Sequence, residues 1–178
     1  MSRVIATGNL RAHKATPCDW LSDIMVSVAD EGDAFTFSFH LVGDIEEIAL
    51  PEHPSHERRD GLWETTCFEA FLDFGDGHYG EYNFAPAGDW AAYRFTGYRD
   101  GMSAWEVGAP QISAEGHDYM MLITAKIAKP DMPVLRIGLA AVIADWDGEK
   151  SYWALRHPTE KPDFHHEDCF GITLKAGE

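Results

Sequence analysis

The chain has 178 residues, 45% hydrophobic and 12% aromatic, which is enough for one substantial core and predicts a single domain over residues 1–178. Its 30 acidic and 14 basic residues give a formal net charge of −16, which argues against nucleic acid and anionic membranes as partners. The N-terminus is too polar for a signal peptide, and no stretch approaches the roughly 20 apolar residues of a membrane span, so we expect a cytoplasmic protein.

The first predicted element is a β-hairpin. Residues 23–29 and 34–42 are β-rich runs, and a turn-forming triplet at 31–33 separates them. Three phenylalanines of the second run occupy alternate positions: Phe35, Phe37 and Phe39. Because side chains alternate across a strand, these rings are predicted to share one buried face.

A three-strand meander is predicted after a polar loop. Two prolines within residues 51–60 disfavour a central strand there. The next β-rich runs cover 63–74, 79–85 and 89–96, and glycine-containing turns separate them. These lengths and spacings indicate three consecutive strands.

The C-terminal half is predicted to add further short strands. Residues 97–116 are irregular and rich in glycine, with one strand expected around Pro110 to Ser113, whereas 119–128, 135–146 and 151–155 are apolar and strand-like. About eight short strands without long helical periodicity favour an all-β fold, namely an antiparallel β-sandwich of jelly-roll or immunoglobulin-like type with short helices only in connections. A closed barrel is the structural alternative, and the tail after His157 is predicted to be mostly loop.

The run 63–74 has two chemically different faces. Its even positions are apolar and predict a core face: Phe68, Ala70, Leu72 and Phe74. Its odd positions mix rings, small polar groups and carboxylates: Trp63, Thr65, Cys67, Glu69, Phe71 and Asp73. The next strand adds an alternating set to the same region: Tyr79, Glu81 and Asn83. On a concave sheet, this composition suits a platform for a small ligand.

Glu69 and Trp63 each allow two interpretations. A carboxylate flanked by apolar residues is costly to bury alone, so Glu69 either pairs structurally or serves a ligand. The candidate structural partners are arginines: Arg58, Arg59 and Arg94. Trp63 can pack at the core or rim, or it can stack on a ligand. The residues alone leave both questions open.

A second polar cluster near the C-terminus invites a metal hypothesis. Its transition-metal ligand types are His157, His165, His166 and Cys169. The spacing matches neither HExxH nor CxxC. We therefore expect no metal site and keep the three histidines as weak candidates, with histidines hydrogen-bonded inside a loop as the alternative.

No cofactor or catalytic motif is evident. The residues that could ligate haem are Met102, Met120, Met121 and His157, but no CxxCH attachment motif is present. Serine-protease, P-loop and dinucleotide-binding motifs are absent, and no spacing identifies an acid and base pair. We therefore expect a non-catalytic protein without a firmly assigned cofactor.

Several blocks of the sequence resemble a known group of proteins. The blocks are residues 59–72, 82–95, 98–99, 152–157 and 162–165. They are similar to bacterial DOMON-like proteins, which in turn resemble family 9 carbohydrate-binding modules, and the resemblance extends from about Pro17 to Leu174. It implies a β-sandwich that binds sugar or haem and performs no chemistry by itself.

The resemblance also implies roles for single residues. In the carbohydrate-binding modules, a Trp stacks on a sugar ring and a Glu six residues later accepts from its hydroxyls; Trp63 and Glu69 match this spacing. Those modules add an Arg and a second Trp, for which Arg94 and Trp153 are the nearest matches. The full candidate ligand-binding set is Trp63, Glu69, Arg94, Trp153, Trp90 and His157.

Three hypotheses follow for function. The preferred one is a non-catalytic domain that holds a sugar or sugar-like molecule in an aromatic clamp. The alternative is a haem-binding DOMON-type domain that serves electron transfer or sensing. A metal-dependent enzyme built on the C-terminal histidines ranks third.

Overall fold

The computed structural model describes residues 1–51 and 53–175, and nearly all of its regular structure is β-strand. The strands are β1 (Arg3–Ala12), β2 (Leu21–Asp30), β3 (Ala34–Gly43), β4 (Cys67–Gly75), β5 (His78–Phe84), β6 (Trp90–Phe95), β7 (Ser103–Ala104), β8 (Gln111–His117), β9 (Met120–Ala128), β10 (Arg136–Ala144), β11 (Lys150–Ala154) and β12 (Ile172–Thr173). The short 3-10 helices are η1 (Ile45–Glu47), η2 (Leu62–Glu64) and η3 (Glu167–Cys169). Within the described ranges, no helix is long and apolar enough to cross a membrane.

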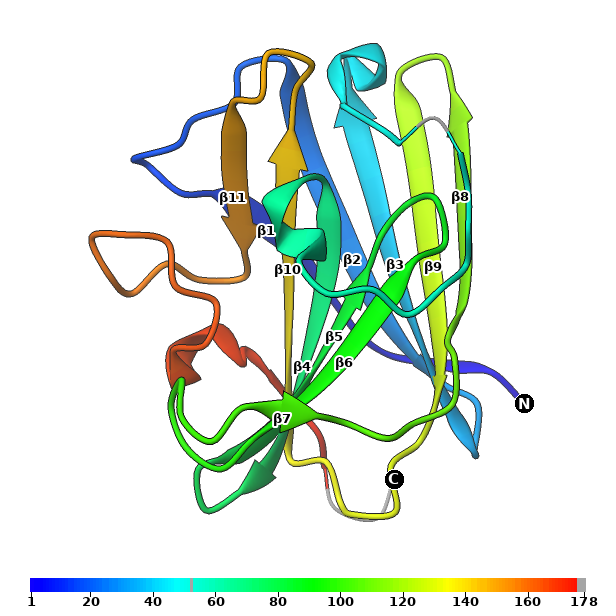
Figure 1. Cartoon of the computed structure of the whole chain (residues 1–178), viewed down its shortest axis with the longest axis vertical. Helices are drawn as coiled ribbons and strands as arrows, with labels where there is room; N and C mark the ends of the chain where they lie inside the picture. Colours follow the sequence, from blue (N-terminus) through cyan, green and yellow to red (C-terminus); the bar gives the residue numbers. More distant parts are fainter. Residues whose placement is uncertain (52, 176–178) are drawn as a thin grey trace.

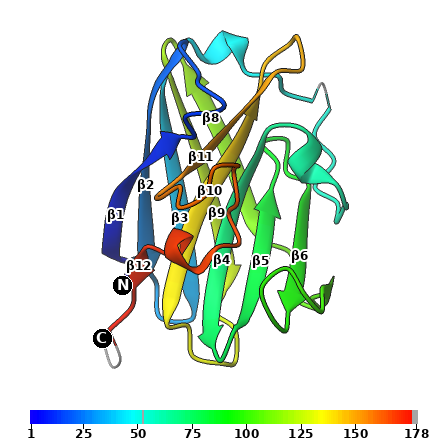
Figure 2. The same ribbon diagram turned by 90° about the vertical axis from the view of Figure 1, so that its left-hand side faces the viewer.

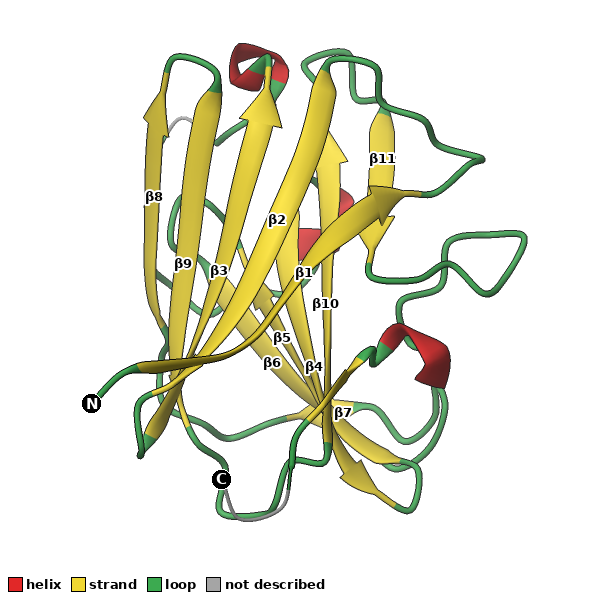
Figure 3. Cartoon of the chain, turned by 180° about the vertical axis from the view of Figure 1, so that it is seen from behind, coloured by secondary structure: helices red, strands yellow, loops and turns green. Residues whose placement is uncertain are grey.

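The strands form one continuous antiparallel sheet that curls until its two halves face each other (Figure 1). The order is β7-β6-β5-β4-β10-β11-β1-β2-β3-β9-β8, and β12 pairs with β10. β1 joins the halves, because most of it pairs with β2 while Arg11 and Ala12 pair with β11 (Figure 3). The prediction of an all-β antiparallel fold is confirmed, and the hydrogen bonding joins its strands into one curled sheet rather than two separate sheets.

The main core lies between the two halves of the sheet. The even residues of β4 point into it, as the alternation predicted, and the three phenylalanines of β3 face them. The rings of Phe39 and Phe68 lie 5.0 Å apart, and both side chains are fully buried. Burial of each such ring contributes about 1.5–3 kcal/mol, so this layer stabilises the curl.

The local predictions differ in outcome along the chain. The hairpin, the meander and the later strands are present as β2–β3, β4–β6 and β9–β11. One correction concerns Trp63, which lies in η2 before the strand, because β4 begins only at Cys67. β1 was not anticipated: Leu10 is its one fully buried residue, so its sequence carries no strong alternation.

A C-terminal segment covers the outer face of β4, β5 and β10 (Figure 2). It is the loop after β11 together with η3 and β12, and its Phe170 ring stacks on Phe71 at 5.8 Å. The close approach requires Gly138 on β10, since a Cβ there would lie 2.8 Å from the Phe170 ring and 3.0 Å from the Cys169 carbonyl oxygen. The half of the sheet built from β4 to β6 thus has apolar contacts on both faces.

Candidate functional site

A cavity of about 370 Å³ lies on this outer face, within the size range of small-ligand pockets. Strand residues, η2, the loop after β6 and the C-terminal segment all contribute to its wall. The lining residues are Trp63, Glu69, Glu81, Phe95, Arg99, Met102, Val142, Tyr152, Pro162, Phe164 and His165. The wall is therefore mostly apolar and aromatic, with a few charged groups.

Trp63 reaches the cavity from η2. Gly61 has a left-handed backbone (φ 78°) that turns the chain into the helix, and Leu62 anchors the helix by packing against the apolar outer face. The Trp63 ring meets the Tyr93 ring edge-on at 6.1 Å, and the Tyr93 hydroxyl donates to Asp60 Oδ1 at 2.7 Å. The indole remains 40% exposed, so it is held in place while one surface stays accessible.

Two carboxylates, Glu69 and Glu81, lie on the outer face of neighbouring strands. Glu69 of β4 pairs with Asn83 of β5, so Glu81, two residues before Asn83, is its diagonal neighbour on the same face. Only 3% of Glu69 and 5% of Glu81 is exposed. Buried carboxylates this close to each other resist simultaneous ionisation.

The electrostatics of the pair follow from this burial. Desolvation raises the pKa of Glu69 well above its usual value, and the Glu81 carboxylate raises it further while the Arg99 guanidinium opposes the change. Desolvation raises the pKa of Glu81 to about 7, against the opposing effects of Asn83 and Arg99. Burial therefore favours the protonated form of both carboxyl groups, which can donate a hydrogen bond.

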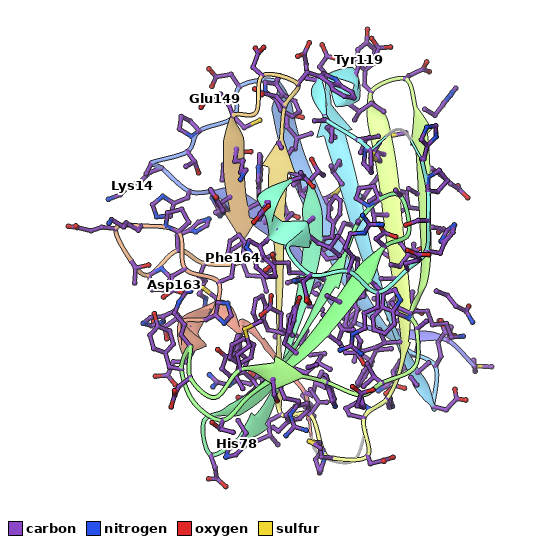
Figure 4. All side chains as sticks on the ribbon, viewed as in Figure 1. Lys14, His78, Tyr119, Glu149, Asp163 and Phe164 are labelled. Atoms are coloured by element: carbon purple, nitrogen blue, oxygen red, sulfur yellow. The ribbon has the colours of Figure 1, made fainter. Side chains whose placement is uncertain are left out.

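Arg99 brings a cation to the rim of the cavity. Its Nε and Nη2 atoms donate to Asp163 Oδ1 at 3.1 and 2.8 Å, and the Tyr98 hydroxyl donates to Asp163 Oδ2. Asp163 belongs to the C-terminal segment, where Figure 4 labels it. The guanidinium is thus oriented and its charge is balanced by a carboxylate outside the pair.

His165 links the carboxylate pair to the wall. The Tyr79 hydroxyl accepts from the Arg99 backbone N–H at 3.2 Å and lies 2.8 Å from His165 Nδ1, which leaves the hydroxyl proton for that nitrogen. His165 Nε2 faces Glu81 Oε2 at 3.7 Å, and it carries the ring proton in the tautomer whose Nδ1 accepts from Tyr79. Burial, with Arg99 nearby, lowers the pKa of His165 to about 4, so at neutral pH the contact with Glu81 is no ion pair.

Aromatic side chains from other elements complete the wall. Tyr152 of β11 and Phe164 of the C-terminal segment pack together with ring centroids 6.0 Å apart. Figure 4 labels Phe164 on that segment beside the sheet. Together with Trp63 they offer apolar surface to the flat face of a ligand.

Comparisons of the sequence with family models and with curated proteins produce no match. Solved structures do share the fold. A putative carbohydrate-binding protein from Bacteroides uniformis superimposes with a TM-score of 0.68 at 13% identity, over 90% of this chain and 82% of that one. A family 9 carbohydrate-binding module from Caldicellulosiruptor kristjanssonii, in complex with cellotriose, gives 0.50 at 13% identity over 83% and 71%.

The fold is similar to that of a family 9 carbohydrate-binding module. The expected resemblance to these modules is confirmed at the level of fold. Identity this low carries no residue roles from one protein to the other, so the geometry of this chain has to support its own site.

Three of the predicted ligand-binding residues lie on the core side of the sheet and do not line the cavity. The Arg94 guanidinium lies over the Phe74 ring at 4.9 Å. Trp153 is buried in the main core, and its Nε1 donates to Ser151 Oγ at 2.9 Å. Trp90 is also buried in that core, with the Arg58 guanidinium over its ring. The structure therefore brings Trp63 and Glu69 together in the cavity, and these three residues lie elsewhere.

The C-terminal histidines are engaged in separate contacts. His157 Nε2 lies 2.6 Å from the Arg11 carbonyl oxygen and outside the cavity, and the His166 ring accepts from the Asp168 backbone N–H at 3.2 Å. In the part of the chain that the structure describes, no three His, Cys, Asp or Glu residues are grouped to hold a metal ion. Of the four candidate haem ligands, Met102 alone lines the cavity.

Several cavity residues were not predicted as ligand-binding, although some left a trace in the sequence. Glu81 belongs to the alternating set on β5 that faces the platform. Tyr152 directly precedes the predicted Trp153, and a shift of one residue moves a side chain to the other face of a strand. Arg99 and Phe164 lie in loops without periodicity. Both belong to blocks that carry the family resemblance, residues 98–99 and 162–165, but the resemblance implied no role for them.

Proposed function

We propose that the cavity binds a sugar or sugar-like molecule and catalyses no reaction. The observation that carries this proposal is the accessible Trp63 ring beside the buried Glu69 carboxyl in one cavity. An apolar surface with a few placed polar groups suits a ring that has an apolar face and hydroxyls at its edge. The carbohydrate-related neighbours, one of them in complex with cellotriose, support the same class of ligand.

The cavity residues divide the work of recognition. Trp63, Tyr152 and Phe164 supply stacking surface, while Glu69 and Glu81 accept from or donate to hydroxyls according to their protonation. Arg99, oriented by Asp163, offers further donors at the rim. Stacking of the ligand on the aromatic rings contributes affinity, and hydrogen bonds to the carboxyl groups fix the orientation of the ligand.

Isothermal titration calorimetry with mono- and disaccharides tests the proposal. We expect saturable heat with at least one sugar and loss of that heat in Trp63→Ala. Trp146→Ala is the matched control, because Trp146 is 62% exposed and lies outside the cavity lining. Absence of heat with every sugar, or equal binding by both variants, would overturn the proposal.

A further inference from the structure

Among the described residues, no Lys or Arg forms an ion pair with either carboxylate of the cavity. Within residues 1–51 and 53–175, Glu69 forms no side-chain hydrogen bond or ion pair. The titratable side chain that contacts Glu81 is His165, at 3.7 Å, and this histidine is neutral at pH 7. Arg99 lines the cavity, but Asp163 already balances its charge by accepting two hydrogen bonds from it. Arg99 would therefore compensate an ionised Glu69 and Glu81 only in part.

A second buried group near the pair also lacks a partner. Asn83 is fully buried directly opposite Glu69, and neither its amide nitrogen nor its oxygen has a partner at ordinary hydrogen-bond distance among the described residues. Buried polar groups normally find a partner in protein, water or ligand. Asn83 lies behind the cavity wall, so the strand carboxyl groups that an occupant can reach are Glu69 and Glu81, and carboxyl oxygens suit an occupant rich in hydrogen-bond donors.

The walls suit the same occupant. Aromatic faces attract cations through their negative π-surfaces, and Trp63, Tyr152 and Phe164 all line the cavity that Glu69 enters. A neutral polyol would leave both carboxyl groups in the protonated form that desolvation favours. A protonated amine instead offers three donors and the missing positive charge.

We propose that this cavity selects an amino sugar, a sugar-like ring that carries a protonated amine, which the Glu69 and Glu81 pair holds between aromatic walls. This inference rests on the proposed sugar-binding function and names its ligand class. Arg99 lies at the rim with its charge balanced by Asp163, so it orients hydroxyls and leaves the amine to the carboxylates.

Binding is expected to release protons. The charged and titratable groups that share the cavity wall with Glu69 are Glu81, Arg99, Tyr152 and His165, and the buried Cys67 thiol lies two residues before it on the same strand. Burial keeps the pKa of both carboxyl groups raised in the absence of a ligand. A bound ammonium group favours their ionised forms, so protons leave the carboxyl groups as the ligand enters.

Calorimetry with two matched disaccharides tests the inference. Fully deacetylated chitobiose carries 2-amino groups where cellobiose carries hydroxyls, and diacetylchitobiose is the neutral N-acetylated form. At pH 6–7 we expect deacetylated chitobiose to bind at least about tenfold more tightly than the other two, the scale of one charge-assisted hydrogen bond. Titration at pH 6, where the free amine is already protonated, in buffers of different ionisation enthalpy should show net proton release with the amine ligand alone.

Glu69→Gln removes the charge and keeps the size of the side chain. It should bring the affinity ratio between deacetylated chitobiose and cellobiose to within about twofold, whereas Glu115→Gln, an exposed residue of β8, should keep the native ratio. Circular dichroism and thermal unfolding establish that each variant is folded. A ratio that survives in Glu69→Gln indicates general attraction to the acidic surface and overturns the inference.

The remaining outcomes separate the two proposals. If cellobiose or diacetylchitobiose binds as tightly as the amine ligand and the binding is lost in Trp63→Ala, the amino-sugar inference fails and the sugar-binding proposal stands. If no sugar of the panel binds the folded native protein, both fail.

Discussion

The two faces of the sheet formed by β4, β5 and β6 differ in what covers them. The inner face carries Phe68, Ala70 and Leu72 and is closed by the other half of the same sheet. The outer face carries Glu69, Glu81 and several aromatic residues and is closed by the C-terminal segment. The two halves of the sheet pack against each other and form an apolar core. The loop that covers the mixed outer face leaves a cavity with carboxylates in its wall.

This difference separates stability from recognition along the same strands. Adjacent residues of β4 point in opposite directions, so Phe68 contributes to the fold and Glu69 to the cavity. The buried carboxylates cost stability that the inner face offsets. Substitutions on the two faces should therefore change different measurements.

The largest expected effect is on the inner face. Phe68→Ala should lower the free energy of unfolding by about 3–5 kcal/mol, because a fully buried ring is replaced by a void. Tyr152→Ala, in the cavity wall, should cost about 1–2 kcal/mol and mainly weaken ligand binding. Urea unfolding of the two variants measures the difference, and equal losses would contradict the distinction between the faces.

Gly138→Ala should disturb the cover of the outer face. The new Cβ would approach the Phe170 ring and the Cys169 carbonyl oxygen too closely, so the segment that carries Phe164 and His165 must shift, at a cost of about 1–3 kcal/mol. Gly108→Ala is the control, because no heavy atom lies within 4 Å of its Cβ position. We expect Gly138→Ala to bind ligand more weakly and to have a lower unfolding free energy. If this variant is destabilised but binds ligand as native protein does, the C-terminal segment is not part of the binding site.

Glu81→Gln should change how stability depends on pH. The folded-state pKa of about 7 lies above the ordinary 4.5, so this group stabilises the fold below about pH 4.5 and loses that contribution as pH rises toward 7. Between pH 5 and 8, the unfolding free energy of native protein should therefore decrease by on the order of 2 kcal/mol relative to that of Glu81→Gln.

His165 changes the unfolding free energy in the opposite direction over an overlapping pH range. Its folded-state pKa of about 4 lies below the ordinary 6.5, so its contribution is present above about pH 6.5 and is lost as pH falls toward 4. The unfolding free energy of Glu81→Gln minus that of native protein, measured by urea titration at each pH, isolates the carboxyl group. A difference that stays constant with pH would contradict the raised pKa of Glu81.

The smallest expected effects are those of substituting two arginines, Arg94 and Arg99. Arg94→Met should leave ligand affinity unchanged and cost about 1 kcal/mol of stability, because Arg94 packs over Phe74 on the core side. Arg99→Met should weaken binding, since Arg99 lines the cavity. Calorimetric affinities of the two folded variants check this, and loss of binding in Arg94→Met would contradict the placement of that side chain.

Much of the fold could be predicted because strand periodicity is local. The alternating phenylalanines of 34–42 and the two faces of 63–74 identify strands and their buried sides. β1 was not predicted from the sequence, because a mostly exposed strand shows no alternation of apolar and polar residues. The curl into one sheet depends on β1 pairing at both ends, which is a long-range property.

The candidate site could be predicted only in part, for a related reason. Trp63 and Glu69 are close in sequence and reach the same cavity. The choice between Trp153 and Tyr152 depends on one residue of register, and the choice between Arg94 and Arg99 depends on where a loop returns to the sheet. Neither is visible in composition or spacing.

The sequence alone determined the strand-rich class and the mixed face of β4, because backbone alternation turns a period of two residues into two chemically distinct faces. Only the tertiary structure decided that this mixed face becomes a cavity. Phe164 and His165 meet Glu69 from more than 90 positions away in the sequence. Such contacts arise from the register of β10 and the close approach that Gly138 permits, and local patterns do not encode them.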